Sequence, residues 1–344
     1  MFRPHPIEAS RKVPGNEPGA QRHSRERLAR WSELGYGMFI HFGMSTFVGH
    51  EMTLGTESID LYNPTDLDVD QWVQVARDAG MKYMVLTTKH VSGHCLWPTD
   101  QTDAHVGNSP VKTDVVGEFV NACNKHGIVP AFYYCSWDNR NRFGSLVPTI
   151  SLEDQAGNWN MAYTTPRYRD FQLAQVEELL TRYGNIGQVW IDIPGMLGND
   201  GRRQQYDQIA ALQPDTIITM NNGISNGTQL SYNSAWPTDI ITIERYLPSS
   251  DRGHNPWFEV PDGAGGTKPY YLPAEVCDPI GYDWFFVDED RPRSTEELLG
   301  MRLITEARGA NLLLDVPPDR TGKIPQIHVD ALLALERAYR QAKG

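Results

Sequence analysis

The chain has little of what would bind it to nucleic acid or a membrane, or place it in an oxidising compartment. Its 43 acidic and 31 basic side chains give a formal net charge of −12 at pH 7, which disfavours polyanionic partners. No stretch reaches the roughly 20 apolar residues of a transmembrane helix. The four cysteines, Cys95, Cys123, Cys135 and Cys277, show no CxxC spacing, so neither a zinc motif nor a disulfide framework is expected.

The N-terminus also lacks the apolar segment of a secretory signal. Residues 1–24 are polar and rich in arginine and proline, and we expect them to form an arm ahead of a single catalytic domain over residues 25–344. The expected location is therefore the cytoplasm. No helix shows a coiled-coil seam, and the assembly state stays open, a homo-oligomer included.

Strand-like and helix-like stretches alternate along the whole chain. The strand-like runs are almost continuously apolar, as expected when both faces of a strand are buried. They lie at 36–41, 83–88, 129–134, 187–192, 216–220, 239–243 and 311–314, with a seventh-strand candidate at either 274–277 or 282–287. Amphipathic helical stretches separate most of them. This alternation predicts an α/β fold, a (β/α)8 barrel of the TIM type whose outer helices have room for irregularity.

Polar and ionisable residues stand at the ends of most predicted strands. They are His41, His90, Tyr134, Asp192, Asn221, Glu244 and Asp315. Active sites of such barrels lie at the C-terminal ends of the strands. The recurrence of these residue types at corresponding positions therefore predicts one functional pocket there.

Two carboxylates facing each other at strand ends are the minimum equipment for glycoside hydrolysis. Asp192 and Glu244 are the predicted pair. Asp192 shares a strand face with Trp190, and Glu244 follows an apolar strand that would help to keep it protonated. Glu275 is a competing candidate for the acid. Neutral imidazoles and a phenol, such as His41, His90 and Tyr134, are suited to holding sugar hydroxyls.

A metal site is the main alternative for the same residues. His41, His90 and Asp192 are ligand types found in barrel metallohydrolases. The sequence lacks the His-x-His pair that often marks such sites. We therefore predict neither a bound metal nor any other cofactor.

Several motifs in a fixed order resemble the α-L-fucosidases of glycoside hydrolase family 29. The resemblance covers about residues 25 to 342. It rests on GYGMFIHFGMSTF, YNPTDLDVDQWVQVARDAGMKYMVLTTKHVSGHCLW, KTDVVGEFVNACNKHGI with FYYCSW, VWID, and GANLLLDVPPDRTGKI near the end. Of the family's usual domains we expect the barrel alone, without the C-terminal β-sandwich that is common there.

The resemblance implies a retaining, exo-acting hydrolase of α-L-fucosides or related glycosides. It implies Asp192 as the nucleophile and Glu244 as the acid/base, with Glu275 second. It assigns sugar-binding positions to His41, Glu51, His90, Tyr134 and Trp190, and Asn221 joins them as a strand-end residue. The implied partner is an oligosaccharide or other glycoside, with no nucleic acid and no membrane.

This chain departs from the family pattern in its predicted sugar pocket. Val91 stands where the family usually has a second histidine, and Met52 replaces an aromatic residue after Glu51. An arginine that some members place after the fifth strand is absent, and Asn221, Asn222 and Gly223 stand there instead. Loss of a hydrogen-bonding group can change sugar discrimination strongly. A glycosidase for a different sugar, or a carbohydrate-binding homologue without turnover, therefore stays open.

Overall fold

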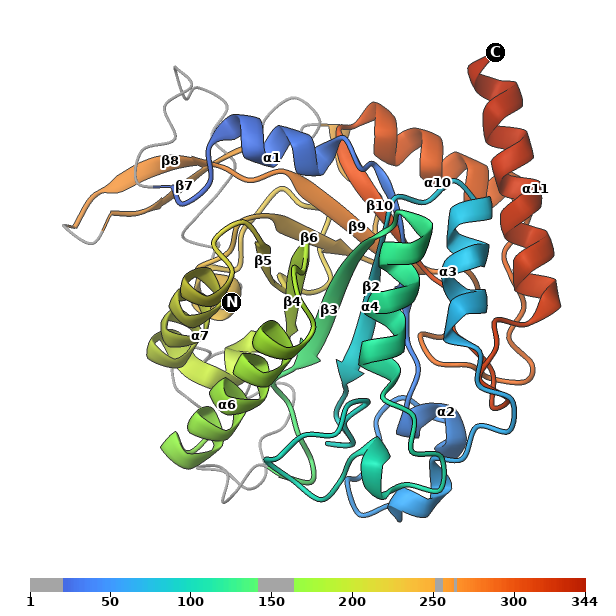
Figure 1. Ribbon diagram of the computed structural model, residues 1–344. Coiled ribbons are helices and arrows are strands. Elements are labelled where there is room, and N and C mark those ends of the chain that lie inside the picture. Colours follow the sequence, from blue (N-terminus) through green and yellow to red (C-terminus); the bar gives the residue numbers. More distant parts are fainter. Residues whose placement is uncertain (1–20, 142–163, 251–255, 263–264) are drawn as a thin grey trace, which may run out of the picture.

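Eight parallel strands form a nearly closed barrel in the structure, a computed structural model that describes residues 21–141, 164–250, 256–262 and 265–344 (Figure 1). The strands are β1 (Tyr36–Ile40), β2 (Tyr83–Lys89), β3 (Val129–Cys135), β4 (Gln188–Asp192), β5 (Ile217–Met220), β6 (Ile241–Glu244), β9 (Ala274–Pro279) and β10 (Ala310–Asp315). Their order in the sheet is β5-β4-β3-β2-β1-β10-β9-β6. The predicted (β/α)8 barrel is confirmed, and the seventh strand is the earlier of the two candidates.

Between β5 and β6, side-chain oxygens accept hydrogen bonds from backbone N–H groups. Backbone N–H groups in and just after β5, those of Ile218, Met220 and Asn222, donate to side chains that precede or belong to β6, those of Asp239, Thr238 and Thr242, at 2.7, 3.1 and 2.6 Å. Buried N–H groups need partners in any sheet. These side chains supply them where the paired ladder ends.

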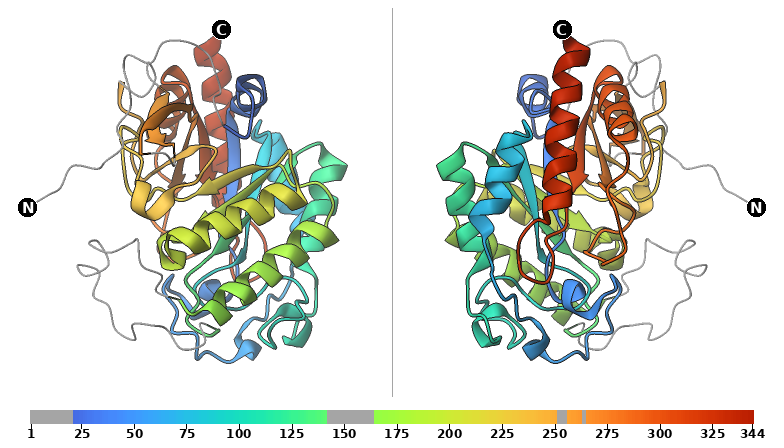
Figure 2. Two further views of the ribbon diagram at one scale, coloured as in Figure 1. Left: turned by 90° about the vertical axis from the view of Figure 1, so that its left-hand side faces the viewer. Right: turned by 90° about the vertical axis from the view of Figure 1, so that its right-hand side faces the viewer.

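Helices surround the barrel on its outside and at its ends (Figure 1). They are α1 (Arg25–Ser32), α2 (Met44–Val48), α3 (Val69–Asp78), α4 (Val115–His126), α6 (Pro166–Arg182), α7 (Gly198–Leu212), α8 (Tyr232–Ala235), α10 (Thr295–Ala307) and α11 (Gln326–Lys343), with short 3-10 turns at Ile59–Leu61, Val106–Asn108 and Pro194–Leu197. Figure 2 shows them wrapped around the strands from two further sides. None of these helices combines the length and apolar character needed to cross a membrane.

The helix ends follow local capping rules. Ser294 begins α10 with a capping box, in which its side chain and that of Glu297 each accept a backbone N–H. Asp114 and Thr165 cap α4 and α6 in the same position. Gly127 ends α4 at φ 70°, a conformation that favours glycine. Capping therefore sets these boundaries locally, independently of the barrel.

The outer layer is irregular around β6, as the sequence allows. Only the short α8 lies between β5 and β6. The described part of the connection between β6 and β9 carries an antiparallel hairpin, β7 (Trp257–Pro261) and β8 (Thr267–Tyr271). Of the expected N-terminal arm, residues 1–20 lie outside the described residues. Arg22 binds Asp239, and His23 bonds the Thr216 carbonyl at 2.9 Å, so this short segment packs against the β5–β6 region.

Three apolar clusters build the core of the described residues: one between barrel and helices, one inside the barrel, and a small one in which α1 packs against Ile217 and Ile240. The inner cluster is aromatic and includes Phe39, Tyr133 and Trp190. Gly37 makes room for it, because a Cβ at that position would lie 2.5 Å from the Tyr83 ring. Among the described residues, the barrel interior is therefore packed below, and a cavity opens toward the C-terminal ends of the strands.

Candidate active site

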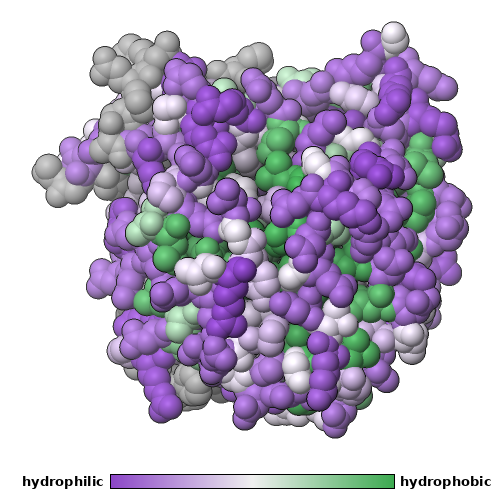
Figure 3. Space-filling model, in the orientation of Figure 1, coloured by the Kyte–Doolittle hydropathy of each residue, from purple (hydrophilic) through white to green (hydrophobic). Residues whose placement is uncertain are grey.

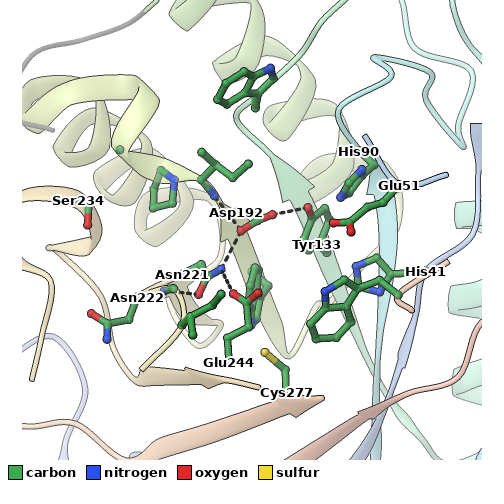
Figure 4. Close-up of a pocket in the computed structure, with 18 of the residues that line it drawn as sticks. His41, Glu51, His90, Tyr133, Asp192, Asn221, Asn222, Ser234, Glu244 and Cys277 are labelled. Atoms are coloured by element: carbon green, nitrogen blue, oxygen red, sulfur yellow. Dashed lines mark hydrogen bonds between the residues drawn. The ribbon is translucent and has the colours of Figure 1, made fainter. Parts of the chain in front are cut away.

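A cavity of about 580 Å³ opens at the C-terminal ends of the strands. This volume is typical of sites that bind small ligands. Seven of the residues predicted for the site line it: His41, Glu51, His90, Trp190, Asp192, Asn221 and Glu244. Figure 4 shows Asp192 between Tyr133 and Asn221, with His41, Glu51 and His90 on one side and Asn222 and Ser234 on the other.

Asp192 is held by three hydrogen bonds. Its Oδ2 accepts from the Tyr133 hydroxyl at 2.6 Å, and its Oδ1 accepts from Asn221 Nδ2 at 2.8 Å and from the Ile193 backbone N–H at 2.9 Å. The Tyr133 ring stacks on Trp190, with ring centroids 5.4 Å apart. The carboxylate orientation therefore depends on the packed aromatic interior of the barrel.

Glu244 lies next to Asp192 through a shared partner. The same Asn221 nitrogen that binds Asp192 also donates to Glu244 Oε2 at 3.0 Å (Figure 4). Burial raises the pKa of Glu244 to about 7, and the nearby charge of Asp192 adds to this rise. The two carboxyl groups thus differ in environment, which is the arrangement that separates an acid from a nucleophile.

Glu51 is a third carboxyl group at the cavity. It follows α2 in the loop after β1, and the Ser45 hydroxyl donates to its backbone carbonyl at 2.9 Å. Burial raises the pKa of Glu51 to about 7, with a further contribution from the charge of Asp192. A carboxyl group with this pKa can donate or accept a hydrogen bond near neutral pH.

Two neutral imidazoles lie on the same side of the cavity as Glu51 (Figure 4). Burial lowers the pKa of His41 to about 3, and a 2.7 Å bond from Nδ1 to Asp315 fixes its ring. Burial also lowers the pKa of His90 well below its ordinary value. His90 stacks on Tyr133, and no described residue bonds its Nδ1. Both rings can therefore offer hydrogen bonds to a neutral, hydroxylated ligand.

The prediction for Tyr134 is wrong, and Tyr133 takes its place. Successive strand residues point to opposite faces. Tyr134 faces the outer helices, where its hydroxyl donates to Gln175 at 2.8 Å and its ring contacts Lys89. Tyr133 pairs in register with Trp190. Trp190 and Asp192 both face inward, so the register between β3 and β4 identifies Tyr133 as the tyrosine that faces the cavity.

Glu275 does not reach the cavity, which makes it a wrong second choice for the acid. It is the second residue of β9 and lies fully buried inside the barrel. Its carboxyl group accepts from Tyr83, Gln188 and Trp190 at 2.7, 2.8 and 3.2 Å. Burial raises its pKa to about 7. Glu275 supports the cavity floor from below, through Trp190.

Some residues of the cavity are absent from the sequence prediction. Trp284, in the stretch considered as an alternative seventh strand, lies against the His41 ring with centroids 5.2 Å apart. Only a contact between distant segments reveals it. Val91 is fully buried in the inner apolar cluster and does not line the cavity. Within the described ranges, no three His, Cys, Asp or Glu side chains are grouped so that they could hold a metal ion.

A parallel barrel with two close carboxyl groups at the C-terminal ends of its strands has the features of the barrel glycoside hydrolases. Comparison with known proteins narrows this class. The chain belongs to the α-L-fucosidase family, whose model matches residues 56–338.

Individual relatives agree with the family. The chain is 30% identical over 318 residues to alpha-L-fucosidase 1 of Arabidopsis thaliana, covering 88% of this chain and 57% of that protein. It thus spans little more than half the length of this curated relative. Among solved structures, alpha-L-fucosidase isoenzyme 1 from Paenibacillus thiaminolyticus is 26% identical, with a TM-score of 0.72 over 92% of this chain and 75% of that one. An alpha-L-fucosidase from Lactobacillus casei, 22% identical, shares the fold over 99% of its chain with a TM-score of 0.69.

Proposed function

We propose that this protein is a retaining, exo-acting α-L-fucosidase. Asp192 attacks the anomeric carbon while Glu244 gives its proton to the leaving-group oxygen, so the glycosidic bond breaks as the bond to Asp192 forms. Glu244 then takes a proton from water, which attacks the same carbon and releases the sugar and the Asp192 carboxylate. Atoms balance with water as the only co-reactant.

The observation that carries this proposal is the double hydrogen bond of Asn221. Because one nitrogen binds Asp192 Oδ1 at 2.8 Å and Glu244 Oε2 at 3.0 Å, these oxygens cannot be further apart than the two bonds laid end to end. Inverting enzymes need a separation of roughly 6.5–9.5 Å to admit water, whereas retaining enzymes have about 5–5.5 Å. The geometry supports the retaining mechanism.

The sugar assignment rests on the relatives and on the chemistry of the cavity wall. The related proteins described above are α-L-fucosidases. His41 and His90 are neutral, and together with Glu51 they suit sugar hydroxyls. A different sugar is the second candidate, because Val91 and Met52 replace family residues and Val91 offers the cavity no hydrogen bond.

Variants of the two carboxyl groups test the mechanism. With 4-nitrophenyl α-L-fucoside, Asp192→Gly should lose more than about 1,000-fold in kcat, and added azide should restore turnover and yield the fucosyl azide of inverted configuration. Glu244→Gly should lose about 100-fold or more on substrates with poor leaving groups and much less on activated ones. Asp207→Ala, at an exposed carboxyl group on α7, is the matched control.

Each outcome has a distinct meaning. Unchanged turnover in folded Asp192→Gly would reject the nucleophile assignment. Turnover of another glycoside but not of the fucoside would retain the mechanism and change the sugar. Binding of fucose with no turnover of any glycoside would favour the carbohydrate-binding homologue.

The cytoplasmic location and the assembly state stay predictions. Cell fractionation tests the first, and light scattering coupled to size-exclusion chromatography measures the second.

A further inference from the structure

Two exposed apolar side chains line the cavity. In the described ranges, the large apolar residues with exposed side chains are Met52, Leu54, Leu61, Ile224, Tyr246, Tyr282 and Ile327. All but Ile327 lie in connections that follow the C-terminal ends of strands. Met52 and Ile224 line the cavity itself while 51% and 66% exposed. Scattered exposed apolar residues are ordinary, but exposed apolar residues that line a cavity indicate a binding surface.

Ile224 lies on the side of the cavity where the leaving group would depart. Its backbone forms a parallel bridge with Glu244, so the two residues are direct neighbours. A general acid must reach the oxygen of the departing group. A leaving group protonated by Glu244 would therefore contact Ile224.

Ile193 adds an apolar face next to Asp192. It lines the cavity and adopts φ 46°, a left-handed conformation that a β-branched residue rarely takes. Such strain persists only where the surrounding structure imposes it. Trp137 also lines the cavity, and its Nε1 donates to Asn139 at 2.7 Å, which leaves the indole with apolar surface for a ligand.

Three polar residues at the cavity, Asn222, Ser231 and Ser234, form hydrogen bonds within their own loop. Asn222 donates to Ser225 Oγ at 3.0 Å and to the Gln229 carbonyl at 3.1 Å, and its Oδ1 accepts from the Ser231 backbone N–H at 2.5 Å. The Ser231 and Ser234 hydroxyls bond each other. Both Asn222 N–H donors and one of the two serine O–H donors are engaged, so a sugar unit bound here would lose hydration at its hydroxyl groups and gain few donors in return.

We propose that Trp137, Ile193 and Ile224 form a subsite for an apolar aglycone, a hydrocarbon-rich alcohol or phenol rather than another sugar. The subsite is continuous with the catalytic cavity, and the inference rests on the proposed glycosidase function. Burial of the exposed face of Ile224 against such an aglycone supplies the binding free energy.

Octyl and methyl α-L-fucosides test the subsite. Both release primary or simple aliphatic alcohols of similar reactivity, so a difference in kcat/KM reports contacts with the aglycone. We expect the wild-type protein to prefer the octyl substrate by at least about tenfold, and Ile224→Ser to lower this preference about threefold to tenfold by removing apolar contact area. The methyl substrate is the internal reference, so an equal loss of kcat/KM for both substrates in Ile224→Ser would contradict the subsite.

The control variant is Ile327→Ser, at an exposed isoleucine on α11 that does not line the cavity. It should keep the octyl preference. Equal kcat/KM for both substrates, or a higher value for a fucosyl disaccharide than for the octyl fucoside, would overturn the apolar subsite and leave the fucosidase proposal standing. No turnover of any fucoside would overturn both.

Discussion

Asn221 carries no charge, yet its side chain sets the distance between the two carboxyl groups. Its Nδ2 serves Asp192 and Glu244, and its Oδ1 accepts from the Gly223 N–H and from the Thr242 hydroxyl, both at 2.8 Å. The amide is fully occupied by protein partners. Its sequence assignment as a sugar-binding residue stays a prediction, and the geometry favours a positioning role.

Arg245 makes the pH dependence of this site testable at a single residue. Its guanidinium lies over the Trp284 ring at 4.9 Å and donates to the Tyr282 carbonyl at 2.9 Å. Burial and the charge of Asp192 raise the pKa of Glu244 to about 7, and the positive charge of Arg245 opposes this rise. Because a general acid works in its protonated form, kcat/KM should fall as the pH rises through the pKa of Glu244.

Arg245→Met should therefore move the alkaline limb of the pH profile to higher pH. Removal of the positive charge leaves the ionised form of Glu244 less stabilised, and the same holds for Glu51. The measurement is kcat/KM between pH 5 and 9 with an unactivated glycoside. Arg245→Lys keeps the charge and should keep the limb, and an unmoved limb in Arg245→Met would contradict the assignment.

At the scale of elements, the contact between β5 and β6 differs from the rest of the barrel. Elsewhere neighbouring strands pair through their backbones. Here Asp239, Thr238 and Thr242 accept backbone N–H groups through their side chains. Asn222, which takes part in this contact, and Glu244, two residues after Thr242, both line the cavity, so the stability of the contact bears on the site.

Thr238→Val should destabilise the fold. The hydroxyl accepts from the Met220 N–H at 3.1 Å and donates to the Ile240 carbonyl at 2.8 Å. Valine keeps the shape but leaves a buried N–H without a partner, which costs about 1–3 kcal/mol. Urea unfolding should report this loss as a lower free energy of unfolding.

Thr305→Val is the matched control for this substitution. Thr305 is equally buried in α10, and its hydroxyl has no hydrogen-bond partner among the described residues. Its replacement should leave stability unchanged or raise it. Equal losses in both variants would show that the Thr238 hydroxyl does not support the barrel.

For the whole molecule, we expect the negative net charge to disfavour anionic substrates. The net charge is −12, the face in Figure 3 is mainly hydrophilic, and three carboxyl groups line the cavity. An aryl fucoside with a carboxylate on its ring should therefore have a lower kcat/KM than the neutral parent.

This difference should shrink as salt rises from 20 to 200 mM, since the screening length falls to about 8–10 Å near physiological ionic strength. The neutral aryl fucoside serves as the reference, because its kcat/KM should not respond to salt. A gap that does not change with salt would point to direct contacts instead of long-range charge.

The sequence by itself determined the order of strands and helices, the barrel and most of the residues at its C-terminal end. Strand ends in a parallel barrel converge, so a polar residue at each end predicts one pocket without any coordinates. Asp192, Glu244, His41 and His90 all reach the cavity for this reason.

Only the tertiary structure decided which of two neighbouring residues faces inward and which distant segments meet. Tyr133 replaces Tyr134 because a shift of one residue reverses the face of a strand. Glu275 lies too early in β9 to reach the cavity, and Trp284 arrives from a loop with no periodic pattern. The two hydrogen bonds from Asn221 to Asp192 and Glu244 depend on angstrom-scale distances between the ends of three strands. A linear pattern of residue types carries no such distances.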